Sequence, residues 1–88
     1  MMMLYNNLNS LDLHGYDRDM ARILINEFIE DNYKLKNRKV IIIHGIGSGI
    51  LRKTTHLVLK NNKYVSNYKL DNFNSGTTIV EINTNIDK

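Results

Sequence analysis

The sequence predicts an α/β domain, specifically an α+β two-layer sandwich with the element order βαβαββ. Three observations predict it. Patterns typical of strands and helices alternate along the chain, hydrophobic residues make up 42% of it, and 88 residues suffice for a single core. There is no cysteine, so neither disulfide bonds nor a cysteine–zinc site contributes. Packing alone must therefore stabilise this core.

The first strand is expected within residues 8–13. Its last two leucines alternate with polar residues, which places the leucines on one face and Asp12 and His14 on the other. Gly15 then ends the strand. Asp12 and His14 are therefore expected to project together from the end of a strand.

The first helix is expected to begin after Asp17, whose carboxylate is a suitable N-cap. Apolar residues then recur at helical spacing and form a stripe that needs a sheet to cover it. We expect Asn32 and the basic segment 34–39 to close the helix and form a loop. The apolar stripe consists of Met20, Ala21, Leu24, Ile25, Phe28 and Ile29.

The second half of the chain continues the alternation. Residues 40–43 are apolar at every position, as expected of an interior parallel strand, and they lead into a glycine-rich turn at 44–49. The remaining elements are expected to be a helix at 50–61, strands at 64–70 and 77–83, and a turn-rich connection at 71–76.

The first two strands are expected to pair in parallel, because a right-handed helical crossover between them is close to obligatory. Both strands then end at the same edge of the sheet, where open α/β sheets place their ligands. His14 follows the first strand and His44 follows the second. We therefore expect both histidines to lie near the N-terminus of the second helix.

The glycine-rich turn is a candidate site for an anion, here a nucleic-acid phosphate. Gly45, Gly47 and Gly49 are expected to leave backbone amides unpaired at the positive end of a helix. Arg52 and Lys53 lie in the first turn of that helix and would add charged donors to the phosphate.

Asp12, His14 and His44 are the candidate catalytic residues. Two imidazoles beside such a site can act as general acid and general base, because an imidazole titrates near neutral pH. Asp12 would orient or charge an imidazole, or it would simply bond to a neighbouring turn. His56 is interpreted as a surface residue of the second helix, and no set of metal ligands is assigned.

Basic residues are concentrated in the middle of the chain. Between Asp31 and Asp71 there is no acidic residue, so this stretch has a charge of +9 while the rest of the chain has −6. A basic half of this kind favours a polyanion over a small neutral ligand, although each lysine alone fits a solvated surface. The basic residues are Lys34, Lys36, Arg38, Lys39, Arg52, Lys53, Lys60, Lys63 and Lys69.

Two other classes of protein are excluded. Residues 47–54 nearly match the phosphate loop of nucleotide hydrolases, but Arg52 stands where a second glycine must close tightly on phosphate. No apolar run is long enough to span a bilayer, and residues 1–7 lack the pattern of a signal peptide. We expect a cytoplasmic domain at 8–83 that does not contact membranes, with flexible tails at 1–7 and 84–88.

Three segments together resemble the small MutS-related (Smr) domain. They are Leu11-Asp12-Leu13-His14-Gly15, His44-Gly45-Ile46-Gly47-Ser48-Gly49 followed by Leu51-Arg52, and Thr77-Thr78-Ile79-Val80-Glu81-Ile82. The likeness covers roughly residues 8–83. It implies a fold like that of the C-terminal domain of translation initiation factor three. That fold has a mixed four-stranded sheet in the order 1-2-4-3, with both helices on one face.

The resemblance also implies an endonuclease or nucleic-acid-binding role, since DNA nicking and RNA cleavage on ribosomes are both associated with the family. It implies that Asp12, His14, His44 and the three glycines of the turn form the site. Two sequence features depart from the family pattern. Met20 replaces a residue that is commonly acidic. Asn74-Ser75-Gly76 contains fewer glycines than the turn that the family usually has before the last strand.

We favour an endonuclease domain that cleaves or nicks a phosphodiester backbone; the alternative is a non-cleaving module that docks on nucleic acid or a ribosome. RNA is slightly preferred over DNA as the substrate. Two-metal cleavage of DNA usually needs several carboxylates, whereas Asp12 is alone, and RNA carries its own nucleophile in the 2′-hydroxyl. No cofactor is certain, and a divalent metal stays open if DNA is the substrate. The pattern indicates no oligomeric state.

Overall fold

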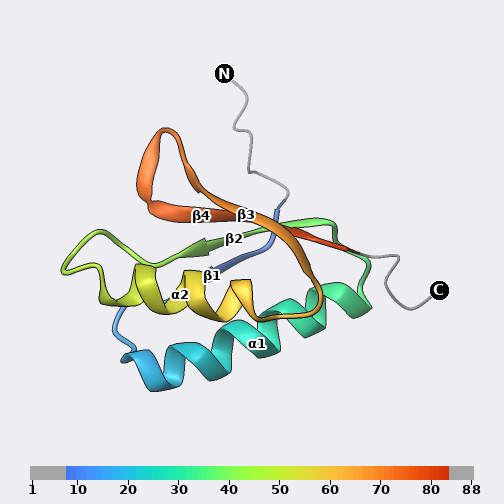
Figure 1. Cartoon of the computed structure of the whole chain (residues 1–88), viewed down its shortest axis with the longest axis horizontal. Coiled ribbons are helices and arrows are strands. Elements are labelled where there is room, and N and C mark those ends of the chain that lie inside the picture. Colours follow the sequence, from blue (N-terminus) through green and yellow to red (C-terminus); the bar gives the residue numbers. More distant parts are fainter. Residues whose placement is uncertain (1–7, 84–88) are drawn as a thin grey trace.

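The computed structural model describes residues 8–83, which form a sheet layer and a helix layer (Figure 1). Both helices cover the same face of the sheet, as the figure shows. The predicted α+β sandwich with the order βαβαββ is therefore confirmed. The elements are β1 (Ser10–Asp12), α1 (Arg18–Lys34), β2 (Lys39–Ile43), α2 (Ile50–Lys60), β3 (Val65–Asp71) and β4 (Asn74–Ile82).

The sheet is mixed and has the strand order β1-β2-β4-β3, as the resemblance implied. β1 pairs with β2 in parallel because α1 carries the chain back across the sheet between them. β4 is antiparallel to both β2 and β3, with Val80 opposite Val40 and Tyr68. β2 is therefore an interior strand, which explains why residues 40–43 are all apolar.

The core lies between the sheet and the two helices. The buried face of α1 is centred on Ala21, Ile25 and Ile29, which are fully buried, whereas Met20 is 43% exposed. The predicted apolar stripe is thus correct in its period, but its centre is rotated by about one residue. These side chains pack against inward-facing residues of β2 and β4 such as Val40 and Val80.

The first helix ends within the basic segment that was expected to close it, but Asn32 takes no part in its end. It continues to Lys34, and Asn32 is buried inside it, with only 2% of its surface exposed. The side-chain oxygen of Asn32 (Oδ1) accepts hydrogen bonds from the side-chain amides of Asn9 and Asn37, both at 2.8 Å. Its own amide donates to the backbone oxygen of Phe28. A buried polar residue must satisfy its hydrogen bonds, and here it fixes the α1–β2 loop.

The connection between the last two strands also differs from expectation. Residues 71–76 were predicted as a turn, but β3 extends to Asp71 and β4 begins at Asn74, so only Asn72 and Phe73 connect them. The Asp71 carboxylate accepts the amide of Phe73 and thereby stabilises this tight turn. Turn-forming residue types occur here inside strands because the pairing is irregular, with a register shift between Leu70 and Asp71.

The two ends of the sheet carry different parts of the chain (Figure 1). The β1–α1 and β2–α2 connections lie at one end, which we call the pocket edge. The α1–β2 and α2–β3 connections lie at the other end, which we call the basic edge. In the part of the chain that the structure describes, no helix is long and apolar enough to cross a membrane. The tails predicted at 1–7 and 84–88 lie outside the described residues.

Candidate phosphate-binding pocket

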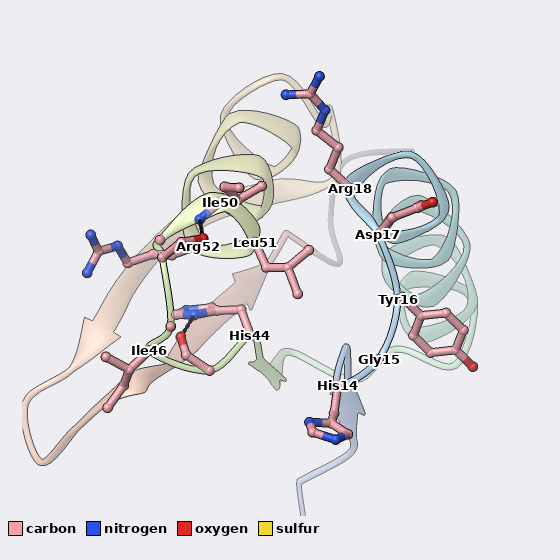
Figure 2. Close-up of a pocket in the computed structure, with 14 residues that line it drawn as sticks. His14, Gly15, Tyr16, Asp17, Arg18, His44, Ile46, Ile50, Leu51 and Arg52 are labelled. Carbon is pink, nitrogen blue, oxygen red and sulfur yellow. Dashed lines mark hydrogen bonds between the residues drawn. The ribbon is translucent and has the colours of Figure 1, made fainter.

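A pocket of about 670 Å³ lies at the pocket edge. One wall is the segment from His14 to Arg18, and the other is the β2–α2 loop together with the first residues of α2. The ends of β1 and β2 are joined by a hydrogen bond of 2.8 Å from the Leu13 amide to the Ile43 oxygen. The two strand ends therefore meet as the parallel pairing predicted. Figure 2 shows Leu51 pointing into the space between the two walls.

The glycines of the β2–α2 loop adopt left-handed backbone conformations. Gly45 has φ of 79° and Gly49 has φ of 88°, a region that side chains with a Cβ rarely adopt. The amides of His44 and Gly45 both donate to the Gly76 carbonyl of β4, each at 2.9 Å. A Cβ on Gly76 would lie only 3.2 Å from the Cα of Gly45. The loop is therefore fastened to β4 by a close backbone contact.

The middle of the loop keeps its amides available. Within residues 8–83, the amides of Ile46, Gly47 and Ser48 donate to no other group. The first turn of α2 adds the amides of Leu51 and Arg52, because the first intrahelical bond of α2 is made by the next residue, Lys53. These amides are the donors that an anion at the pocket would use.

The two helices that begin at the pocket differ at their N-termini. α1 is capped by Asp17, whose carboxylate accepts the amide of Met20 at 2.9 Å. α2 has Gly49 at the same position, with no side-chain cap and no acidic residue in its first turn. The positive end of α1 is therefore already neutralised, whereas the positive end of α2 stays open to an anion.

Arg52 and Lys53 lie in the first turn of α2, as expected. Arg52 is half-buried and contributes to the pocket wall, and Lys53 is exposed. Arg18 is the other cation of the pocket wall. In Figure 2 the guanidinium groups of Arg18 and Arg52 extend outward from the rim rather than into the space between the walls. They can therefore contact a long polyanion that passes over the pocket.

His44 lies at the pocket, but its ring is engaged inside the protein. The residue is 6% exposed. Its Nδ1 lies 2.9 Å from the Gly45 carbonyl oxygen, and its Nε2 lies 2.8 Å from the Thr78 hydroxyl of β4. Thr78 is also 2.8 Å from Nε2 of His56 on α2. The three side chains form a hydrogen-bonded chain that connects β2, β4 and α2.

The chemistry of these groups sets the direction of the hydrogen bonds. A carbonyl oxygen only accepts, so Nδ1 of His44 carries the proton and Nε2 of the neutral ring is an acceptor. The Thr78 hydroxyl then donates to His44 and accepts from Nε2 of His56. In this arrangement His44 has no ring nitrogen left for a ligand.

Both histidines of this hydrogen-bonded chain, His44 and His56, favour the neutral form. Burial lowers the pKa of His44 below its ordinary value of 6.5, against a smaller opposing effect of the Gly45 carbonyl, and the charge of Arg52 adds to the lowering. Burial also lowers the pKa of His56, and the neighbouring His44 and Arg52 act in the same direction. The neutral rings match the hydrogen-bond directions given above.

His56 was interpreted from the sequence as a surface residue, and that interpretation is wrong. The residue is half-buried, bonded to Thr78, and packed at 5.2 Å from the ring of Tyr68. A signal was available in β4, where Thr78, Val80 and Ile82 alternate toward the helices. A threonine in that inward series needs a polar partner, and α2 supplies it.

Asp12 lies on the other side of the sheet from the His44 ring, whereas His14 lines the same pocket as His44. Asp12 pairs with Ile43 and so faces away from the helices, whereas His44 reaches the helix side where Thr78 lies. The Asp12 carboxylate accepts the backbone amide of His14 at 2.9 Å, so it supports the turn. Within residues 8–83 the exposed His14 ring makes no hydrogen bond. The structure therefore places His14 and His44 at one pocket, while Asp12 faces away from the His44 ring.

The donor set of the site consists of amides, imidazoles and guanidinium groups. Among residues 8–83, no three His, Asp or Glu side chains lie close enough together to hold a metal ion. The geometry therefore suits phosphate binding through hydrogen bonds and positive charge, with one imidazole at the rim that can exchange a proton with a bound ligand.

The family model of the Smr domain matches residues 11–83. A curated relative, Endonuclease MutS2 of Clostridium botulinum (strain Eklund 17B / Type B), is 38% identical over 77 residues, which cover 84% of this chain and 10% of the relative. Endonuclease MutS2 of Caldanaerobacter subterraneus is 37% identical over 78 residues, covering 85% of this chain and 10% of the relative. The chain spans about a tenth of the length of these relatives.

Two solved structures have the same architecture. The Smr domain of Thermus thermophilus MutS2 aligns with a TM-score of 0.82 and 23% identity, covering 85% of this chain and 98% of that chain. YdaL, a stand-alone small MutS-related protein from Escherichia coli, aligns with a TM-score of 0.78 and 26% identity, covering 83% of this chain and 63% of that chain. The first likeness concerns the fold alone, and both agree with the order and layers described above.

Proposed function

This chain belongs to the Smr domain family, and from that premise we propose that it binds nucleic acid at the pocket and cleaves its phosphodiester backbone. The observation that carries the proposal is the uncapped N-terminus of α2. Together with the unbonded amides of the β2–α2 loop it offers a row of donors to one phosphate. The MutS2 relatives are named as endonucleases, which supports the same class of reaction.

The proposed roles follow from what each side chain contacts. The loop amides bind the phosphate, and Arg52, Lys53 and Arg18 form a positive rim for the flanking backbone. His14 is the proton-transfer residue, because its ring is exposed and unbonded within residues 8–83. His44 is a positioning residue, because its ring fixes the Gly45 carbonyl and so the shape of the loop.

We favour RNA over DNA as the substrate. The 2′-hydroxyl of RNA attacks the adjacent phosphorus, so the protein needs to supply only proton transfer and stabilisation of the phosphate charge. In that step the 2′-hydroxyl gives its proton to His14 and its oxygen bonds to phosphorus, the P–O bond to the 5′-oxygen of the next nucleotide breaks, and that oxygen takes up a proton from water to become a hydroxyl, which leaves a 2′,3′-cyclic phosphate. DNA nicking requires an external water instead, with a divalent metal as its expected activator.

A second candidate function is docking without cleavage, on RNA or on a ribosome. The engaged ring of His44 favours it, because only one of the two predicted proton-transfer groups stays accessible. Docking would use the same loop amides, Arg52 and Lys53. It would not depend on the His14 ring. The cytoplasmic location expected from the sequence stays a prediction under either function.

The deciding experiment incubates the chain with labelled single-stranded RNA, plasmid DNA and branched DNA, with and without a chelator. We expect RNA cleavage that survives the chelator and that falls about a hundredfold or more in His14→Ala, while RNA binding is retained. The matched control is Asn67→Ala, an exposed residue of β3, which should cleave like the wild type.

Each other outcome identifies a different function. Activity on plasmid DNA that the chelator abolishes would replace the RNA proposal with a metal-dependent nicking domain. Tight RNA binding without cleavage, equal in the wild type and in His14→Ala, would show a docking module. Loss of binding in Arg52→Gln would locate that docking at the pocket.

A further inference from the structure

The basic half of the sequence does not form one surface in the folded chain. Of its nine cations only Arg52 and Lys53 lie at the pocket edge, and Lys69 lies on β3. The other six lie at the opposite end of the sheet, the basic edge. They are Lys34, Lys36, Arg38, Lys39, Lys60 and Lys63, all of them exposed.

Backbone and ring contacts bring these six residues to one edge. The Arg38 oxygen accepts the amide of Ile82, and Lys39 pairs with Glu81, so both cations flank the end of β4. On the other side of β4, the Tyr64 oxygen accepts the amide of Asn83 at 2.8 Å. Cations of the α1–β2 loop and of the α2–β3 connection therefore flank the same strand end.

Aromatic stacking joins the same edge to α1. The rings of Tyr33 and Tyr64 stack with their centres 4.1 Å apart, next to Lys34 and Lys63 in the sequence. The ammonium group of Lys63 lies 5.2 Å from the centre of the Tyr64 ring. The basic edge is thus continuous from the end of α1 across β4 to the start of β3.

The loop that carries the central cations is held rigidly. Buried Asn32 accepts from the Asn37 side chain and also receives the Asn37 backbone amide on its own carbonyl, at 2.9 Å. The amide of Lys36 donates to the Tyr33 oxygen, and Lys36 takes a left-handed conformation with φ of 64°. A pre-formed loop of this kind spares a ligand the cost of ordering it.

Few of these charges are neutralised. The carboxylates near the edge belong to Glu30, Asp31 and Glu81. The ion pair of Lys34 with Glu30 at 3.5 Å is the only one that the edge makes within residues 8–83. The other five cations make no ion pair within residues 8–83. Their positive charge is therefore directed into solvent.

We propose that the basic edge is a second nucleic-acid-binding surface, which contacts the phosphodiester backbone at a distance from the pocket. α1 runs from the pocket wall to this edge, and its 17 residues correspond to roughly 25 Å. A B-form duplex rises about 3.4 Å per base pair, so at least about seven base pairs of a duplex separate the two surfaces. A ligand shorter than this contacts one surface, and a longer one contacts both.

Nucleic acid is the polyanion that fits best, because the second surface then extends a ligand already bound at the pocket. In this respect the inference rests on the proposed function. Two bound surfaces on one chain raise affinity through effective concentration without any new contact at the pocket. An anionic membrane would use the basic edge alone, so the two partners predict different dependence on ligand length.

The test uses Lys36→Gln/Arg38→Gln, which removes two exposed charges and leaves the Arg38 backbone bond in place. Affinity for an RNA duplex of about 24 base pairs and for a hairpin stem of about six is measured against salt concentration. For the long duplex we expect about tenfold weaker binding and a salt slope lower by nearly two units. The short stem, bound at the pocket, should bind Lys36→Gln/Arg38→Gln with the same affinity as it binds the wild type.

The control is Arg22→Gln/Lys69→Gln, which removes the same charge from exposed positions outside the basic edge. If both double variants have the same slope on the long duplex, the proposal is overturned. It is also overturned if Lys36→Gln/Arg38→Gln loses binding to phosphatidylserine vesicles but not to the duplex. A drop in slope without any cleavage by the wild type would retain this surface and reject only the catalytic function of the pocket.

Discussion

The two ends of the sheet, the pocket edge and the basic edge, differ in the groups that they present to a ligand. At the pocket edge the loop is built from glycines, fastened to β4 by two bonds to the Gly76 carbonyl, and supplied with backbone amides. At the basic edge the loop is fixed by a buried asparagine and supplied with exposed side-chain cations. The pocket edge offers hydrogen-bond donors at fixed positions, whereas the basic edge offers mainly positive charge.

The difference separates specificity from affinity. Amides at fixed positions select a phosphate of one geometry and are weakly affected by salt. Exposed lysines and arginines add affinity that is lost as salt rises, and they read no sequence. We therefore expect substitutions at the pocket edge to change what the chain recognises, and substitutions at the basic edge to change how tightly it holds any nucleic acid.

The largest effect is expected from Gly76→Val at the pocket edge. The new Cβ would lie 3.2 Å from the Cα and 3.3 Å from the carbonyl carbon of Gly45, and neither is a flexible side-chain end. Relief requires the loop to move away from β4, at a cost of about 3 kcal/mol in the free energy of unfolding. Urea unfolding measures it, with Ser75→Val, an exposed neighbour in β4, as the control. Equal stability of the two variants would mean that the loop yields freely.

A somewhat smaller loss is expected from Asn32→Ala, which should loosen the basic edge and spare the pocket. It leaves the side-chain amides of Asn9 and Asn37 without their acceptor, which costs about 2 kcal/mol. Hydrogen exchange of the Asn37 amide should accelerate more than that of Lys53 at the start of α2. Asn37→Ala removes one of these bonds and should cost less. If exchange accelerates equally at both edges, the two ends do not behave as separate regions.

The smallest effect is expected from acidification, and it concerns the pocket edge. The folded pKa values of His44 and His56 are lowered from 6.5, so the unfolded chain binds protons first as pH falls. Stability should be constant above about pH 6.5 and decline below it by at most about 1.4 kcal/mol per pH unit for each histidine.

His56→Gln should reduce that decline, while His14→Gln should not, because the His14 ring lies outside the hydrogen-bonded chain. Urea unfolding at several pH values measures both slopes. A His56→Gln variant that declines as steeply as the wild type would remove His56 from the titration.

The sequence predicted those parts of the fold that depend on local pattern. The apolar run of β2, the N-cap Asp17 and the glycines of the β2–α2 loop each have one dominant physical reason for their place, and the structure agrees. Asn32 was misread because an asparagine late in a helix usually ends it. Its real partners, Asn9 and Asn37, become apparent only when β1 and the loop are folded around it.

The candidate site was predicted in position but not in side-chain direction. Alternation along β1 and β2 brings His14 and His44 to one edge, yet the register places Asp12 opposite Ile43, on the face away from Thr78. The link of His44 to Thr78 joins residues 34 positions apart, and no local pattern encodes it. The basic residues likewise follow one another along the sequence but do not form one surface in the fold. For example, Lys53 lies at the start of α2, near the pocket edge, and Lys60 lies at its end, near the basic edge.

The place of β4 in the sheet has a consequence for the order of events during synthesis. Of the elements described here from β1 to β4, this strand is synthesised last, yet it lies between β2 and β3 and supplies both the Gly76 carbonyl and the Thr78 hydroxyl. The loop at 44–49 is therefore synthesised well before the Gly76 carbonyl that accepts its hydrogen bonds. The pocket is therefore the last part of the domain to form, and a nascent chain that has not yet added β4 carries its cations without it.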